Sequence, residues 1–203
     1  IHERLVGSEM CIRDRYYSFW NRVWITENPT NTMSPGKGYT IRTPKEGVWG
    51  APYPETVVFP YAQPVSFIGK PNNGVYTVTV NSNAGRYNFI GNPYPSALDA
   101  DVFVPDNAGA IIGTIYIWTH NTPITSSNYV YSQDDFASYN ASLGAGVAAA
   151  SSIIPGANTN EPTGKVAAGQ GFFTISTTGT TGSITFNNSM RAVAAASNSQ
   201  FFK

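Results

Sequence analysis

The sequence predicts an all-β domain, an antiparallel β-sandwich or jelly-roll-like fold with one or two short helical turns. Short runs rich in Val, Ile, Thr, Tyr and Phe recur between clusters of Gly, Pro and Asn, as strands recur between turns. Apolar residues at helical spacing are scarce. The chain has 203 residues, of which 41% are hydrophobic and 13% aromatic, and this is enough for a packed core.

Nine strands are expected from these runs, and their spacing suits a sandwich or a jelly roll. In chain order they lie near Tyr16 to Ile25, Gly38 to Thr43, Val65 to Gly69, Gly74 to Asn81, Arg86 to Gly91, Ile111 to Thr119, Tyr129 to Ser132, Gly171 to Ser176 and Ser183 to Asn187.

The strand from Gly74 to Asn81 has the clearest alternation, with Val78 and Val80 on one face and threonines on the other. It follows Pro71-Asn72-Asn73-Gly74, whose residue types predict a turn. We expect residues 81–85 to close a hairpin with the strand that begins at Arg86. We expect a second hairpin over Phe172 to Phe186, turning at residues 178–182.

Two short helical turns are predicted. Ser96-Ala97-Leu98-Asp99 fits a capping box after a proline, with Ser96 accepting from early amides and Asp99 reaching back. The second turn is Ser132 to Asp135, which leads into Phe136 to Tyr139. Residues 143–169 are small, polar and rich in alanine, so they predict a long mobile loop.

Residues 1–15 are excluded from this fold, which leaves residues 16–203 as the β-rich module. The stretch Arg4 to Arg15, RLVGSEMCIRDR, matches an in-frame translation of a transposase-based sequencing adaptor. Its removal takes away Cys11, the single cysteine of the chain. The sequence also stops at Phe201-Phe202-Lys203, within what reads as the start of another strand, so we expect a fragment cut at both ends.

Charge and hydropathy exclude several classes of partner. Lys and Arg number 12, as do Asp and Glu, and residues 1–15 contain three of each sign, so the remainder is also neutral. No net field attracts nucleic acid or an anionic membrane. No run approaches the roughly 20 apolar residues that a membrane-spanning helix needs. The charged fraction of 12% is about half the usual share, as in secreted β-rich modules.

No catalytic constellation is present in the sequence. There is neither a GxSxG nucleophile motif nor an HExxH zinc motif, and His120 is the only histidine after residue 15. Lys37 in Ser34-Pro35-Gly36-Lys37-Gly38 does not fit a phosphate loop, because a strand rather than a helix follows it, and it predicts a turn. We therefore expect the module not to be an enzyme.

Aromatic residues and neighbouring amides form the candidate ligand-binding set. Flat rings on a β-scaffold stack on sugar faces while amide groups bond the hydroxyls. Trp20, Trp24, Trp49 and Trp118 accompany many tyrosines. The residues chosen for ligand binding are Trp118, His120, Asn121 and Tyr139. The alternative is that these rings fill the core and its rims, and that His120 bonds locally at a strand end.

Five carboxylates form a candidate calcium set, because hard cations prefer clustered carboxylate, amide and carbonyl oxygens. They are Asp99, Asp101, Asp106, Asp134 and Asp135, with Asn107 beside them. Their spacing is not that of an EF-hand loop. Helix capping and ordinary solvated turns account for the same residues, so Ca²⁺ is one of two interpretations.

Six segments in order carry a family resemblance: SPGKGY (Ser34 to Tyr39), PNNG (Pro71 to Gly74), GNPYPSALDADVF (Gly91 to Phe103), IYIWTHNT (Ile115 to Thr122), AAGQGFF (Ala167 to Phe173) and FNNSMR (Phe186 to Arg191). Together they resemble the C-terminal portion of large surface and secreted proteins of Bacteroidetes-type bacteria. Those proteins commonly end in a type IX secretion sorting domain, which the present sequence does not contain.

The resemblance implies export across the outer membrane, followed by release or attachment at the cell surface. It implies no catalytic residues. We expect a non-catalytic structural or adhesion module, with extracellular glycans or neighbouring domains of the same chain as partners. The alternative is a carbohydrate-binding module, calcium-assisted or not, attached to a polysaccharide-degrading enzyme.

Overall fold

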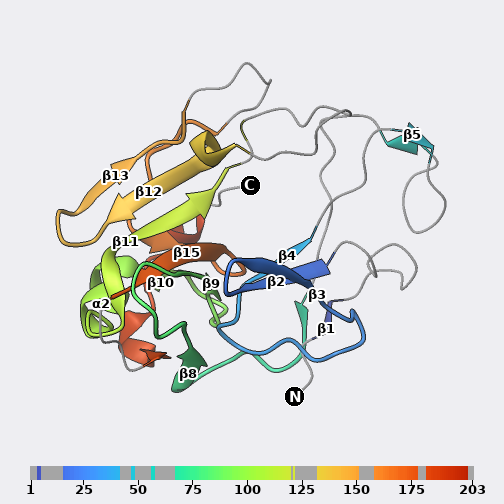
Figure 1. Cartoon of the computed structure of the whole chain (residues 1–203), viewed down its shortest axis with the longest axis horizontal. Helices are drawn as coiled ribbons and strands as arrows, with labels where there is room; N and C mark the ends of the chain where they lie inside the picture. The colour runs from blue at the N-terminus through green and yellow to red at the C-terminus, as the bar shows by residue number, and fades with distance from the viewer. Residues whose placement is uncertain are drawn as a thin grey trace.

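The structure, a computed structural model, describes residues 4–5, 16–41, 47–48, 56–57, 67–119, 121, 132–150, 158–177 and 182–200. A central sheet of five antiparallel strands organises them (Figure 1). Its strands in spatial order are β13 (Ala145–Val147), β12 (Phe136–Asn140), β11 (Ile111–Trp118), β15 (Gly171–Ser176) and β9 (Tyr87–Gly91). The predicted all-β antiparallel fold is confirmed.

One face of this sheet carries the main hydrophobic core. Successive side chains of a strand point to opposite faces, so Ile115 and Ile117 of β11 share this face. The face is covered by the two-stranded sheet of β8 (Tyr76–Thr79) and β16 (Ser183–Phe186) and by helix α2 (Ala100–Asp106). Phe103 of α2 stacks on Phe186 of β16 with ring centroids 4.8 Å apart.

The other face is aromatic and is covered by β2 (Tyr16–Trp20), β3 (Val23–Thr26) and β4 (Tyr39–Ile41), a sheet of order β3-β2-β4. Phe89 stacks on Phe173 at 4.6 Å, while Phe19 and Trp24 meet Phe173 edge-on at 5.4 and 6.1 Å. The central sheet thus lies between two layers.

The Ser34 to Tyr39 segment joins these layers. Lys37 N donates to Ser34 O across a turn in which Gly36 has a φ of +79°, so the turn predicted at Lys37 is confirmed. Gly38 N then donates to Phe89 O at 3.0 Å. A Cβ at Gly38 would lie 2.7 Å from the carbonyl carbon of Phe89, so only glycine permits this approach.

The single strand predicted over Tyr16 to Ile25 is wrong, because a hairpin divides it into β2 and β3. Asn21 and Arg22 form the two-residue turn with φ values of 50° and 68°. Asn tolerates this left-handed conformation, as the tightest hairpin turns require. Apolar and aromatic residues flank this turn on both sides, so the sequence pattern predicted one continuous strand.

The two predicted hairpins are also wrong, although their strands are present. β8 pairs with β16, and β9 pairs with β15. The connections from β8 to β9 and from β15 to β16 therefore cross between layers instead of closing hairpins. Alternation determined which face each strand buries, but it carried no information about the partner of each strand.

The N-cap of helix α2 lies three residues after Ser96, the N-cap of the predicted capping box. Asp99 is the N-cap, and its Oδ1 accepts from the amide of Asp101 at 3.1 Å. Ser96 Oγ instead accepts from Arg191 Nε. The second predicted turn is confirmed as the 3₁₀ helix η1 (Gln133–Asp135), which leads into β12. Two further 3₁₀ turns are η2 (Asn188–Met190) and η3 (Ala195–Asn198).

Short strand pairs complete the described residues. β1 (Arg4–Leu5), which lies in the excluded segment, pairs with β7 (Phe67–Ile68), and β5 (Gly47–Val48) pairs with β6 (Thr56–Val57). β10 (Leu98–Asp99) pairs with β14 (Lys165–Val166). The predicted loop over 143–169 is thus interrupted by β13 and β14.

Residues 129–131 of the strand predicted at Tyr129 to Ser132 lie outside the described residues, while Ser132 is the N-cap of η1. No helix in the described part of the chain is both long enough and apolar enough to cross a bilayer.

Asn107 ties α2 to the edge of β16. Its buried Nδ2 donates to Phe103 O and Thr185 O, and its Oδ1 accepts from Thr185 N at 2.8 Å. We expect Asn107→Ala to lower the free energy of unfolding by about 2–3 kcal/mol, because two groups of Thr185 lose their partner. Urea unfolding measures this, with Asn160→Ala as the exposed control. A loss no larger than that of the control would contradict the assignment.

Candidate functional site

The candidate ligand residues Trp118 and Tyr139 lie on opposite faces of the central sheet. Trp118 ends β11 and pairs in register with Phe136, whose ring it meets edge-on at 4.9 Å. Tyr139 pairs with Ile115 and is buried in the main core. Because side chains alternate along a strand, these two rings cannot contribute to one surface.

Asn121 is a buried structural residue and does not face solvent. It is fully buried, its Nδ2 donates to Asn158 O at 2.8 Å, and its Oδ1 accepts from Asn158 N at 2.7 Å. This two-way pair attaches the segment that begins at residue 158 to the end of β11. His120 lies outside the described residues. The predicted ligand set is therefore not assembled as one exposed site in the described structure.

Asp99 and Asp101 come together, but around a lysine. Lys165 Nζ lies 2.6 Å from Asp99 Oδ1 and 3.7 Å from Asp101 Oδ2. The Tyr139 hydroxyl donates to Asp101 Oδ1 at 2.7 Å. The ammonium group thus takes the position between the carboxylates that a bound cation would need. This cluster links α2, β12 and β14.

The other acidic candidates are engaged elsewhere or point to solvent. Asp106 ends α2 and is exposed. Ser132 Oγ lies 3.1 Å from Asp134 Oδ2, and the carbonyl of buried Asp135 accepts from Thr119 Oγ1 at 2.6 Å. Among the described residues, no three His, Cys, Asp or Glu side chains gather as a set of metal ligands.

The environment of Tyr139 keeps its phenol protonated. Burial, followed by the hydrogen bond to Asp101 and the charges of Asp101 and Asp99, raises its pKa to about 12. A neutral donor bound to a carboxylate has no proton to exchange near neutral pH. Tyr139 is therefore a structural link between β12 and α2.

The β2–β3 hairpin carries the exposed aromatic surface that the sequence did not single out. We call Trp20, Val23, Trp24 and Ile25 the hairpin surface, and their exposed fractions are 43, 59, 49 and 41%. Trp20 pairs with Val23 and Trp24 pairs with Phe19, so Trp20, Val23 and Ile25 share the outer face of the hairpin. Trp24 lies on the inner face and is exposed at its margin. Large exposed apolar side chains gathered on one element are typical of an interaction site. Trp24 also meets Phe89 edge-on with ring centroids 5.9 Å apart, and this contact with the central sheet holds the indole in place.

An ion pair between Glu27 and Lys37 links the hairpin to the turn before β4. Glu27 accepts from Ser18 Oγ of β2 at 2.5 Å and from Lys37 Nζ of the turn before β4. Burial acts to raise the pKa of Glu27, but the hydrogen bonds from Lys37 and Ser18 outweigh it, and the pKa is lowered. Tyr16 stacks on Tyr39 at 5.2 Å beside this pair. These contacts of Glu27 and Tyr16 hold the hairpin that carries the hairpin surface in place.

One comparison with known proteins finds a match. A family model described as a domain of unknown function, DUF8693, matches residues 9–203, and the match begins within the segment excluded by sequence analysis. No curated protein and no solved structure matches the chain.

The link through Tyr139 has a testable pH dependence. Below pH 10 the phenol is protonated in both states, so Tyr139→Phe should lower the free energy of unfolding by about 1–2 kcal/mol. Between pH 10 and about 12 only the folded state keeps the proton, so wild-type stability falls as the pH rises. The difference between the proteins should therefore shrink, as urea titrations at pH 9 and 11.5 would measure. A constant difference would contradict the raised pKa.

The position of Lys165 gives a prediction for calcium. Because its ammonium already pairs with Asp99 and Asp101, we expect millimolar CaCl₂ to leave the Tm unchanged relative to NaCl of equal ionic strength. Differential scanning fluorimetry measures this. A rise of several degrees specific to Ca²⁺ would return the five aspartates to consideration as ligands.

Proposed function

We propose that this chain, which belongs to DUF8693, a family described as a domain of unknown function, is a non-catalytic structural or adhesion module of an exported bacterial surface protein. The observation that carries the adhesive role is the hairpin surface. Two tryptophans about half exposed on a braced β-hairpin offer apolar contact area at little cost in conformational entropy.

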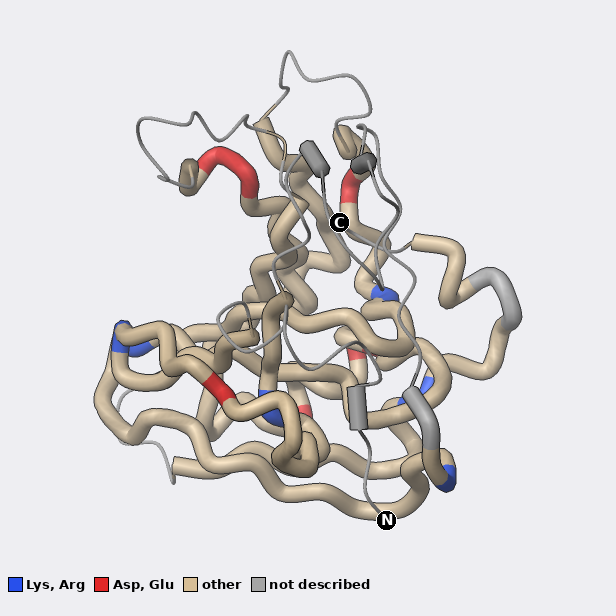
Figure 2. Tube along the Cα trace, turned by 90° about the vertical axis from the view of Figure 1, so that its right-hand side faces the viewer, with Lys and Arg blue, Asp and Glu red and all other residues tan. Residues whose placement is uncertain are grey.

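The charges of the described residues favour a neutral partner. Figure 2 shows positively and negatively charged positions spread along the trace of the described residues. The carboxylates of Asp99 and Asp101 pair with Lys165, and that of Glu27 pairs with Lys37. An extracellular glycan or a neighbouring domain of the same chain fits such a surface better than nucleic acid does.

Surface location is the part of this proposal that rests on the resemblance to secreted proteins of Bacteroidetes-type bacteria. The low charged fraction of 12%, with neutrality maintained outside residues 1–15, supports it. Fractionation of cells that express the native gene, with an antibody against this chain, tests the location. Recovery in the cytosol alone would overturn the exported role.

The adhesive role is tested by retention on surfaces. Beads that carry the 203-residue chain should be retained on insoluble polysaccharide or mucin-coated glass above albumin-coated beads. The double variant Trp20→Ser with Trp24→Ser should reduce retention at least about fivefold, because truncated aromatic anchors each cost about 1–2 kcal/mol.

The matched control replaces Leu143 and Val147 with serine. These side chains are also exposed and apolar, but they lie at the β13 edge of the central sheet. Their replacement should leave retention unchanged. Equal losses in both double variants, or wild-type beads that behave as albumin beads, would overturn the adhesive role.

A further inference from the structure

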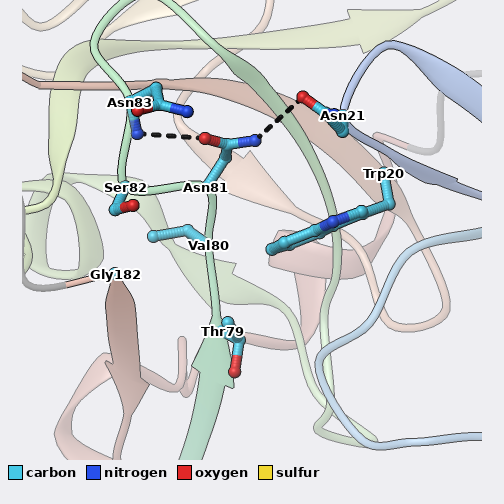
Figure 3. A pocket seen from close by; sticks show the side chains of 8 residues that line it. All are labelled: Trp20, Asn21, Thr79, Val80, Asn81, Ser82, Asn83 and Gly182. Carbon is cyan, nitrogen blue, oxygen red and sulfur yellow. Dashed lines mark hydrogen bonds between the residues drawn. The ribbon is translucent and has the colours of Figure 1, made fainter.

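A hollow of about 440 Å³ lies beside the hairpin surface. It is lined by Trp20 and Asn21 of the hairpin, by Thr79 to Asn83 at the end of β8, and by Gly182 just before β16. Its volume falls in the range of about 300–1,000 Å³ that is usual for small-molecule sites. Figure 3 shows these residues converging from two layers of the fold.

Trp20 supplies a flat apolar wall. Its indole extends from β2 across the hollow toward Val80, as Figure 3 shows, and 43% of the residue is exposed. Val80 is buried and forms part of the floor. An exposed indole beside an apolar floor suits a ligand with a flat hydrocarbon face.

Amide and hydroxyl groups complete the rim of the hollow. Asn81 Nδ2 donates to Asn21 Oδ1 at 3.4 Å, and Asn83 N donates to Asn81 Oδ1 at 3.0 Å (Figure 3). Within the described part of the chain, Asn21 Nδ2, the side-chain amide of Asn83 and the Ser82 hydroxyl have no hydrogen-bond partner. Asn amides and hydroxyls both donate and accept, so the rim matches a ligand rich in hydroxyl groups.

The rim is held in place from beneath by buried polar residues. Asn81 N donates to Asn88 Oδ1 at 2.7 Å, and Asn88 Nδ2 donates to Ser176 Oγ at 2.8 Å. Val80 N also donates to Gly182 O at 2.9 Å. Asn88 and Ser176 belong to the central sheet, so the rim is positioned before any ligand arrives, and little ordering is required on binding.

We propose that this hollow binds one neutral pyranose unit of an extracellular polysaccharide or glycan. The C–H face of the sugar stacks on Trp20, and its hydroxyls bond Asn21 and Asn83. No residue of the lining is charged, so an anionic sugar or a nucleotide phosphate would find no counter-ion there. This inference rests on the proposed adhesive role and names the partner for part of the hairpin surface.

The direct test is titration of the full chain with neutral oligosaccharides. Maltohexaose, cellohexaose, mannohexaose and xylohexaose serve as probes, trigalacturonic acid as the anionic comparison, and calorimetry as the readout. We expect at least one neutral probe to bind. Trp20→Ala should weaken that binding at least about tenfold, and Asn83→Ala by about threefold to tenfold.

Tyr87→Ala is the matched control. Tyr87 is 44% exposed, close to the exposure of Trp20, and it is not part of the lining. Its replacement should change the affinity by less than twofold. Trp20→Phe keeps an aromatic face and should retain most of the binding, so it serves if Trp20→Ala fails to fold in circular dichroism.

Three results would overturn the inference: no neutral probe binds at millimolar concentration, Trp20→Ala binds as wild type does, or trigalacturonic acid binds best. If the probes fail while bead retention still depends on Trp20 and Trp24, the sugar site is wrong and the adhesive role stands. If a probe binds but beads are not retained, the adhesive role fails and the site stands.

Discussion

Phe172 and Phe173, neighbours on β15, point to opposite faces of the central sheet, and both faces must be covered. Phe172 enters the core with α2 and β16, and Phe173 stacks on Phe89 beneath the β2–β3 hairpin. A sheet with one face exposed to solvent would need only one covering layer. Two large rings in succession exclude that arrangement, because each ring exposed to water would forfeit its transfer free energy.

The second layer is the smaller one, and this explains where the exposed aromatics lie. The hairpin covers the face around Phe173 with Phe19 and the edge of Trp24, while Trp20 and the outer side of β3 remain open. Glycine at position 38 lets this layer approach β9 closely, and the Glu27 to Lys37 pair braces it. A candidate binding surface thus arises at the margin of a layer that packing requires.

Buried asparagine side chains join distant backbone segments of this protein by hydrogen bonds. Asn92 Nδ2 donates to Ser96 O and Val166 O while its Oδ1 accepts from Tyr94 N, and this holds the turn after β9 against β14. Asn107 and Asn121 join distant backbone segments in the same two-sided way. Each amide satisfies a donor and an acceptor without burying a charge, which is consistent with a charged fraction of only 12%.

The sequence by itself determined the fold class and the positions of most strands, because alternation and turn chemistry are local properties. It also predicted the turn at Lys37 and the helical turn at Gln133–Asp135. Only the tertiary structure decided that β8 pairs with β16 and β9 with β15, since many strands of similar pattern can satisfy the same burial requirement. It also placed Tyr139 and Asn121 inside the fold and Trp20 at its surface. These aromatic and amide side chains look alike in sequence, and the coverage of each by a distant segment decides which of them meet solvent.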